Sequence, residues 1–359
     1  MLILPEDLTS TCIDAFTARY GSEPTRLARA SGRVNLIGEH VDYVGGQCLP
    51  VAIPYATWVA ARLRDDDRVL LSSAGHEPWE GERGTAARDL PGWGRYALAA
   101  LEESGHHAGL EIHVESTVPT GAGLSSSAAL ICAVLRAVDD RANHDLVDPA
   151  IRAETVRLGL PTGGLDQTIS LLGQVGHALR LDFSGARPVM VPWSPGAAGL
   201  ELLVVDTGVR HDNSDGAFAR VRSTSERALA GETGDPRLER HRRHVEGENR
   251  RVDEVVQALV RGDWRSVGAA MTASHASLRD DLQVSCAELD GVVEVALGRG
   301  ALGARMTGGG FGGCALVLAP TELRGQLLES FDELWHERGF RARPDMRLGD
   351  AEGPATRLR

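Results

Sequence analysis

Residues 118–130 read Val-Pro-Thr-Gly-Ala-Gly-Leu-Ser-Ser-Ser-Ala-Ala-Leu, a glycine-rich turn between a predicted strand (110–115) and a predicted helix (125–138). Such a turn directs backbone N–H groups at an anion, and the helix dipole adds positive potential there. Three serines are more than one helix cap requires, so one hydroxyl can cap the helix while another ligates Mg²⁺ on a nucleotide. The alternative is an ordinary glycine turn with serine caps. The stretch predicts an α/β chain with a phosphate site at this junction.

The sequence contains no lysine, so its 38 basic residues are all arginines. A P-loop or a protein-kinase site would place a lysine on the nucleotide phosphates. A P-loop and a protein-kinase nucleotide site are therefore both excluded. A chain of this composition that binds ATP must use main-chain amides, hydroxyls, a metal ion and arginine.

Length, charge and cysteine content restrict the class of protein. A chain of 359 residues is too long for one ordinary core and indicates two lobes around a cleft. Its net charge of −12 argues against nucleic acid or an anionic membrane as partner. Five scattered cysteines without a C-x-x-C pair indicate buried thiols in a reducing cytoplasm. With no signal peptide and no membrane-length apolar run, we expect a cytoplasmic monomer that acts on small molecules.

Strand and helix patterns alternate along both halves of the chain, as in a two-lobed α/β or α+β protein. Further strands are predicted at 34–37, 49–53, 57–63, 69–72, 200–206 and 314–319. Further helices are predicted from the Asp235-Pro236 cap to Gly262, behind a capping box at 285–288, and from 323 to Gly339. The densest run of proline and glycine, 184–199, places the lobe boundary between 1–190 and 191–359.

A polar turn in residues 32–46 gathers Glu39, His40 and Asp42 after a strand and before Gly45-Gly46. Several acceptors within a few residues suit the recognition of several hydroxyl groups, each of which needs a partner once buried. The alternative is a solvated hairpin.

Two further segments carry candidate chemistry. Glu154 and Asp166 flank a turn with Pro161 and two glycines, and Asp166 either caps the next helix or orients a hydroxyl nucleophile. Residues 304–314 hold five glycines in six positions, which suits either a tight interlobe crossing or closure over a ligand. His241 and His244 lie on an arginine-rich helix and are expected on a solvated face.

With these segments in this order, nearly the whole chain resembles the GHMP small-molecule kinases, and within them the galactokinases. Residues 32–46 are similar to the family's sugar signature, 118–130 to its phosphate loop and 306–314 to its third motif. Residues 274–290 resemble the galactokinases in particular. The resemblance implies a ribosomal-S5-like first lobe, a ferredoxin-like second lobe and an active site between them. It also implies MgATP-dependent phosphorylation of galactose at its C1 hydroxyl.

The resemblance also implies a role for each candidate residue. Asp166 is the catalytic carboxylate, acting as a base or orienting the hydroxyl, and Arg33 neutralises charge beside it. The residues expected at the sugar are Glu39, His40, Asp42, Gly164 and Phe218. Those expected at the nucleotide are Gly121, Ala122, Gly123, Leu124, Ser125, Ser126 and Ser127. Ser127 and Glu154 are the expected Mg²⁺ ligands.

One position departs from the family pattern. Phe218 occupies the place of a tyrosine that usually contacts the sugar, so the ring is kept and the hydroxyl is lost. The loss predicts a weaker or broader sugar preference. The alternatives are a kinase for a related sugar, such as N-acetylgalactosamine or arabinose, and a galactose- and ATP-binding sensor without turnover.

Overall fold

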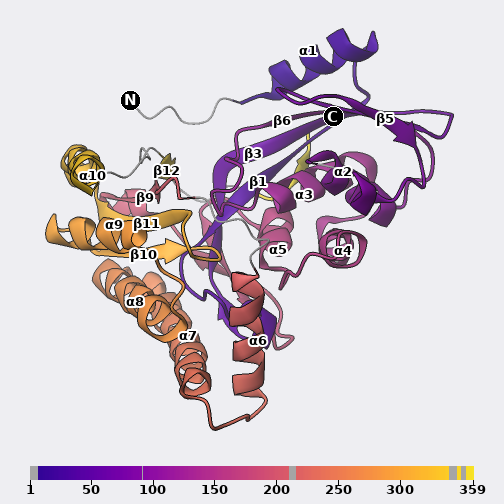
Figure 1. The fold of residues 1–359 in the computed structure, drawn as a ribbon. Coiled ribbons are helices and arrows are strands. Elements are labelled where there is room, and N and C mark those ends of the chain that lie inside the picture. Colours follow the sequence, from indigo (N-terminus) through magenta and orange to yellow (C-terminus); the bar gives the residue numbers. More distant parts are fainter. Residues whose placement is uncertain (1–6, 91, 210–215, 339–345, 349–352) are drawn as a thin grey trace.

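The computed structural model describes residues 7–90, 92–209, 216–338, 346–348 and 353–359. Figure 1 shows two lobes, one formed around the strands of the first half of the chain and the other around β9–β12 with helices α8–α10. The predicted mixed α/β fold is confirmed, whereas the boundary at residues 190 and 191 stays a prediction. No helix in the described part of the chain combines the length and apolar character needed to cross a membrane.

The first lobe is built on a six-stranded sheet in the order β13-β1-β3-β6-β4-β5. Neighbours are antiparallel except β4 and β6, which run parallel. Its strands are β1 (Arg26–Asn35), β3 (Pro50–Leu63), β4 (Arg68–Ser73), β5 (Trp79–Glu82), β6 (Leu110–Ser116) and β13 (Thr356–Arg357). A smaller sheet contains β2 (Gln47–Cys48), β7 (His177–Asp182) and β8 (Val189–Pro192).

The strands predicted at 49–53 and 57–63 are one strand, β3, and the strand predicted at 34–37 is the end of β1. The apparent break at Pro54 reflects an irregular ladder, not a turn. Ser31 pairs with Ala56 but Arg33 pairs with Ala52, so the register shifts where proline has no N–H to donate.

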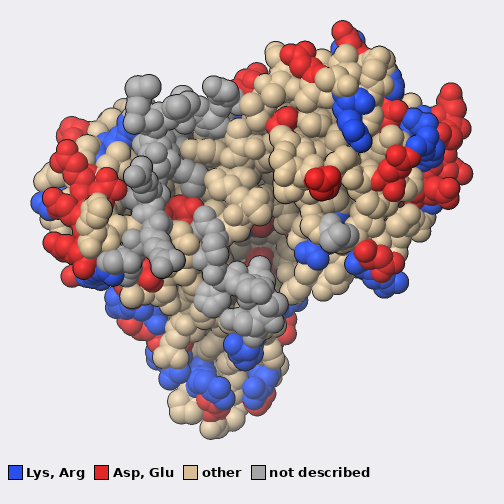
Figure 2. Space-filling view, turned by 45° about the horizontal axis from the view of Figure 1, so that its top comes forward, with Lys and Arg blue, Asp and Glu red and all other residues tan. Residues whose placement is uncertain are grey.

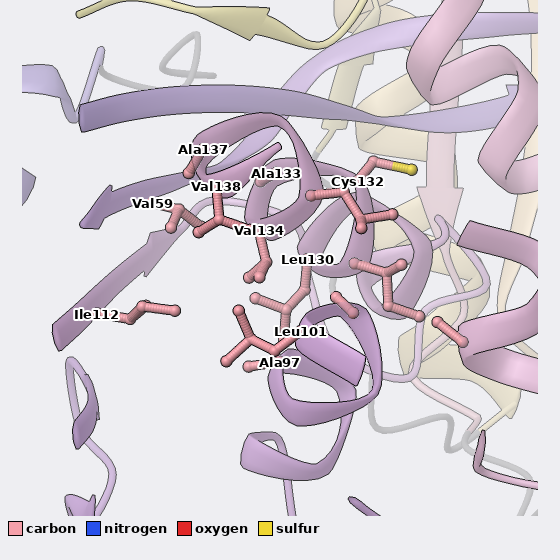
Figure 3. Close-up of a cluster of buried hydrophobic side chains, with 14 of the residues drawn as sticks. Val59, Ala97, Leu101, Ile112, Leu130, Cys132, Ala133, Val134, Ala137 and Val138 are labelled. Carbon is pink, nitrogen blue, oxygen red and sulfur yellow. The ribbon is translucent and has the colours of Figure 1, made fainter. Parts of the chain in front are cut away.

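Helices cover both faces of this sheet (Figure 1). Because side chains alternate along β3, Trp58 and Ala60 face α1, while Val59 and Ala61 face the core around α3. The helices of this lobe are α1 (Thr9–Tyr20), α2 (Gly94–Glu103), α3 (Ser126–Val138), α4 (Asn143–Arg152) and α5 (Leu165–Leu172). Figure 3 shows the apolar side chains of α3 packed with Leu101 and Ile112. This packing fixes the N-terminus of α3, where the glycine-rich turn enters.

The second lobe has a four-stranded sheet in the order β10-β11-β9-β12. Its strands are β9 (Leu200–Asp206), β10 (Gly303–Thr307), β11 (Cys314–Pro320) and β12 (Met346–Leu348). Its helices are α6 (Ala217–Leu229), α7 (Pro236–Arg261), α8 (Trp264–Ser277), α9 (Ala287–Gly298) and α10 (Arg324–Arg338).

The caps predicted for α7 are confirmed, because Asp235 accepts a hydrogen bond from the backbone N–H of Arg237 and Gly262 ends the helix with φ +69°. The capping box at 285–288 is wrong. Cys286 is the N-cap of α9, and the Ser285 hydroxyl donates to Asp290 Oδ1 instead of accepting a hydrogen bond from a backbone N–H of the helix. Gly339, the predicted end of α10, lies outside the described residues.

One of the apolar clusters extends across both lobes. Side chains of β1 and the following turn, such as Val34 and Ile37, pack in one cluster with Val252 of α7 and Leu316 of β11. The C-terminal segment also joins the lobes, because β13 pairs with β1 and the Ala355 N–H donates to the Ser170 carbonyl. The site between the lobes therefore has a largely fixed frame.

Candidate active site

Arg33 and Asp166 meet at the junction of the lobes although they are far apart in sequence. Arg33, near the end of β1, donates from Nε to Asp166 Oδ1 at 2.7 Å, and its Nη2 also lies 2.7 Å from that oxygen. Its Nη1 donates to the Gly123 carbonyl at 2.6 Å. Burial lowers the pKa of the guanidinium, but the charges of Asp166 and Glu39 outweigh this effect and the pKa is raised. A permanent cation therefore links the carboxylate to the glycine-rich turn.

Asp166 is not the cap of α5, contrary to the alternative considered from sequence. Gly164 is the N-cap, and Asp166 is the second residue of the helix. Its Oδ2 accepts the Ser125 hydroxyl at 2.7 Å. Both carboxylate oxygens are thus fixed in direction, and the carboxylate is still partly exposed.

The turn of residues 121–127 leads into α3 with an unusual backbone. Gly123 has φ +77°, and Ser125, the residue before α3, has φ +66°. A serine in the left-handed region is strained, and the hydrogen bond to Asp166 holds it there. Ala122 and Leu124 are buried, which anchors the turn from beneath. The first N–H groups of α3 are consequently placed beside Asp166.

Ser127 and Glu154 form a second pair at the start of α3. The Ser127 hydroxyl donates to Glu154 Oε1 at 2.7 Å, and Gln167 Nε2 donates to Oε2. Glu154 lies in a π-helical turn (Ala153–Arg157) and is buried. Burial, with a contribution from Asp166, raises the pKa of Glu154 to about 7. The carboxylate is thus held by neutral partners, which suits a site that receives a cation.

No group of three or more His, Cys, Asp or Glu side chains suited to a metal occurs in the described part of the chain. Ser127 and Glu154 together offer two hard oxygen donors, and Mg²⁺ requires six. Ligands from a bound phosphate and from water would have to complete the set.

Glu39 is buried beneath the sugar signature and is already bonded within the protein. Its Oε1 accepts from Thr307 Oγ1 and from the Gly308 N–H, both at 2.8 Å, and its Oε2 accepts from Asn35 Nδ2 at 3.0 Å. A carboxylate has about four acceptor positions. Glu39 retains one, on Oε2, for a ligand.

His40 lies in an aromatic group with Tyr43 and Phe218. Its Nε2 is 3.2 Å from the Gly309 carbonyl, which can only accept, so Nε2 carries the proton and Nδ1 accepts the Tyr43 hydroxyl at 3.0 Å. Burial lowers the pKa of His40 to about 3, so the ring is neutral. The Phe218 ring centroid is 5.4 Å from that of His40 and 5.9 Å from that of Tyr43. A sugar would have to compete for the nitrogens of His40 or contact this group through its rings.

Asp42 faces the turn before α5. Burial and the neighbouring charges of Asp166 and Glu39 raise the pKa of Asp42 to about 6. A Cβ added to Gly163 would lie 1.9 Å from Asp42 Oδ2, so only glycine allows this approach. Gly164, which was predicted at the sugar, follows directly and has φ +93°.

The glycine-rich segment after β10 crosses between the lobes. The Gly313 N–H donates to the Val209 carbonyl at 3.0 Å, and the Phe311 N–H donates to the Val284 carbonyl at 2.6 Å. A Cβ on Gly308 would lie 3.3 Å from the Gly123 carbonyl, so this segment lies against the 121–127 turn. The segment therefore makes a close contact between the lobes, and its closure over a ligand stays a prediction. Figure 2 shows the molecule hollowed between the lobes, with acidic atoms visible at depth.

The prediction of a solvated face for His241 and His244 is wrong. Both side chains are buried, because α7 packs against α6 and α8 along that face. His241 Nδ1 pairs with the Ser225 hydroxyl at 2.9 Å, and His244 Nε2 lies 3.0 Å from the Glu39 carbonyl. The many arginines of α7 concealed this face in the sequence.

Sequence reasoning also missed several side chains that support the site. They are Asn35, Tyr43, Gln167, Glu248, Ser274, Arg305 and Thr307. The one signal available was the spacing of four between His244 and Glu248, which places them on the same helix face.

Both the sequence and the fold of the chain are similar to those of known proteins. A galactokinase galactose-binding signature matches residues 14–63, a GHMP kinase N-terminal domain matches 94–174 and a GHMP kinase C-terminal domain matches 255–337. A galactokinase of Streptomyces coelicolor is 41% identical over an alignment of 371 positions, which covers 94% of this chain and 95% of the relative. The human galactokinase is 38% identical, covering 85% of this chain and 86% of the relative.

Solved structures show the same fold. A crystal structure of Lactococcus lactis galactokinase complexed with galactose superposes with a TM-score of 0.89 at 27% identity, covering 98% of this chain and 100% of that one. A mevalonate kinase superposes with a TM-score of 0.72 at 18% identity, covering 91% of this chain and 99% of that one, which supports the fold alone.

Proposed function

Since the chain belongs to the galactokinase family of GHMP kinases, we propose that it transfers the γ-phosphoryl group of ATP to the C1 hydroxyl of galactose. The products are galactose 1-phosphate and ADP. This proposal rests on one observation of the structure. The Asp166 carboxylate is held by Arg33 on one oxygen and by Ser125 on the other, directly beside the start of α3.

In the proposed reaction, Asp166 orients the C1 hydroxyl and accepts its proton as the sugar oxygen bonds to the γ-phosphorus. The bond from that phosphorus to the β–γ bridging oxygen breaks, and ADP carries the released charge. Arg33 lies against the carboxylate and neutralises charge near the transferring group. Phosphoryl transfer depends mainly on such alignment and neutralisation.

The nucleotide is proposed to lie on residues 121–127, whose backbone N–H groups and α3 dipole attract its phosphates. Ser127 Oγ and Glu154 Oε1 would hold Mg²⁺, which neutralises phosphate charge when bound. The buried Glu154 fits this role because the side chains that donate to it, Ser127 and Gln167, are both neutral.

The sugar is proposed to lie against Glu39, Asp42, Gly164, the His40 ring and Phe218. The superposed Lactococcus lactis structure holds galactose, which supports galactose as the substrate class. Phe218 has no hydroxyl group and cannot form a hydrogen bond with the sugar. We therefore propose that the protein discriminates less strongly among sugars than it would with a tyrosine at this position. The five scattered cysteines, four of which are buried, are consistent with action in a reducing cytoplasm.

The test is ADP release by purified protein with ATP, Mg²⁺ and one monosaccharide at a time. The panel contains galactose, glucose, N-acetylgalactosamine and arabinose, and NMR locates the phosphate on the product. Galactose 1-phosphate as the fastest product is expected. A higher kcat/KM for another sugar would reassign the substrate, and turnover no greater than that of Asp166→Asn would indicate a sensor.

A further inference from the structure

Helix α7 of the second lobe presents two buried polar side chains to the sugar signature of the first lobe. His244 and Glu248 are four residues apart on one face of the helix, and both have a relative exposure of 0%. They contact the backbone of residues 38–39, directly before His40. The proposed reaction assigns neither residue a role.

Glu248 binds two successive backbone amides. Its Oε1 accepts from the Gly38 N–H at 2.9 Å and from the Glu39 N–H at 3.3 Å, and Ser274 Oγ donates to the same atom at 2.6 Å. Its Oε2 accepts from Arg251 Nε at 2.8 Å. Removing a carboxylate from water is unfavourable unless the carboxylate is well paired. Such a group fixes the position of whatever donates to it.

His244 binds the same peptide segment from its other side. The Glu39 carbonyl can only accept, so His244 Nε2 carries a proton and donates to it at 3.0 Å. Nδ1 lies 2.9 Å from the Ser277 hydroxyl, which donates its proton to Asp281 Oδ2 at 2.8 Å. Burial lowers the pKa of His244, so the ring stays neutral and keeps this pattern. Both the N–H and the carbonyl of Glu39 are thus bonded to α7.

The held segment has a backbone that needs support. Gly38 has φ +95°, and a Cβ there would lie 2.3 Å from the Gln47 carbonyl. His40 has φ +58°, a conformation that is strained for a residue with a side chain. Residues 37–41 lie outside the helices and strands, so regular secondary structure does not hold this backbone.

Arg305 of β10 lies close to both Glu39 and Glu248. Its Nη1 donates to the Asn35 carbonyl at 3.0 Å, while its Nη2 lies 3.9 Å from Glu39 Oε1 and 3.8 Å from Glu248 Oε1. The guanidinium is fully buried between the two carboxylates. Arg251 pairs with Glu248 Oε2 as well, so two arginines face the two carboxylates at the backbone that positions Glu39.

We infer that Glu248 and His244 are positioning residues for sugar recognition, which fix the Glu39 carboxylate and the His40 ring through the backbone of residues 38–40. This inference rests on the proposed function, because it concerns the sugar half of that site. The nucleotide half is held differently, by Arg33 and by the crossing of Gly308 over the 121–127 turn. Loss of the α7 contacts should therefore raise the KM for galactose and leave the KM for ATP nearly unchanged.

The experiment compares Glu248→Ala and Glu248→Gln with the matched controls Glu111→Ala and Glu111→Gln in the full chain. Glu111 is also a buried carboxylate bound to arginines, Arg62 and Arg64, but it lies on β6 away from the sugar signature. We expect Glu248→Ala to raise the KM for galactose about tenfold or more while the KM for ATP stays within about twofold, since misplaced binding groups have effects of this size. Glu248→Gln keeps one acceptor oxygen and should recover part of the loss.

The two proposals fail in different ways. If the wild-type protein shows no galactose-dependent ADP release, the proposed function fails. If the wild type is active but both KM values change together, or change as in the Glu111 controls, the positioning role is overturned. If Glu248→Ala does not fold, the comparison uses Glu248→Gln, which keeps the size of the side chain, and His244→Ala, which leaves the Glu248 contacts in place. A galactose KM unchanged in both would equally refute the inference.

Discussion

Replacing Glu154 by glutamine should make the protein more stable at alkaline pH while removing its activity. Glu154 is buried beside Ser127 and Gln167, and its pKa is raised from the 4.5 of a free glutamate to about 7. The folded state therefore binds this proton more tightly than the unfolded state does. The free energy of unfolding should fall as the pH rises from about 4.5 to about 7, and the loss should stay constant above that range.

The magnitude follows from the size of the change in pKa. A shift of one pKa unit corresponds to about 1.4 kcal/mol. At pH 8 the ionised Glu154 therefore lowers the free energy of unfolding by about 3 kcal/mol. A glutamine cannot ionise, and its amide group can still accept from Gln167 and donate to Ser127 Oγ. The difference in the free energy of unfolding between Glu154→Gln and wild type should therefore change by about 3 kcal/mol in favour of the variant as the pH rises from 4.5 to 8. The altered titration of Asp42 is present in both proteins and cancels.

Urea denaturation of both proteins at pH 4.5 and pH 8, without nucleotide or metal, measures this difference from the midpoints. MgATP should stabilise the wild type more than the variant, since Glu154 is the proposed ligand. Glu111→Gln is the opposite control, because it loses contacts to two arginines and should be less stable at pH 8. A stability difference between wild type and Glu154→Gln that is equal at both pH values would refute the reasoning.

Three further substitutions test the proposed sugar and catalytic groups. Phe218→Tyr should raise kcat/KM for galactose about fivefold, the value of one hydrogen bond of about 1 kcal/mol, with a smaller gain for glucose; equal kcat/KM values for wild type and variant would contradict the lost-hydroxyl argument. Asp166→Asn should lower the rate of ADP release by about 10²–10⁴ without unfolding the protein; a loss below tenfold would remove Asp166 from the chemistry. Gly163→Ala should raise the galactose KM about tenfold and leave the ATP KM unchanged, since its Cβ would lie 1.9 Å from Asp42 Oδ2; normal galactose kinetics would show that Asp42 can move away freely.

Local sequence signals predicted the elements whose ends are set by neighbouring residues. The Asp235-Pro236 cap and Gly262 gave the bounds of α7, and the alternation before the glycine-rich turn gave β6. The same signals failed at β3, which they predicted as two strands, 49–53 and 57–63, on either side of Pro54. A register shift against β1 accommodates it, and only the paired strand reveals that shift.

The site was less predictable because its contacts join distant segments. Arg33 and Asp166 were placed together by resemblance to a family and not by their spacing. The burial of His244 and Glu248 depends on the backbone of residues 38–39 and on α8, neither of which is visible from α7 alone. Charged and polar residues on a helix are usually solvated, so that sequence pattern favoured the wrong face.

The pairing of β13 with β1 also affects the order in which the molecule can be assembled. A nascent chain emerging from the ribosome carries the rest of the first sheet long before residues 356–357 appear. Until then the outer edge of β1 has open amides, and the place of Ala355 in the apolar cluster around α3 is unfilled. The first lobe is therefore completed only after the second has been synthesised, and the edge of β1 is exposed during that interval.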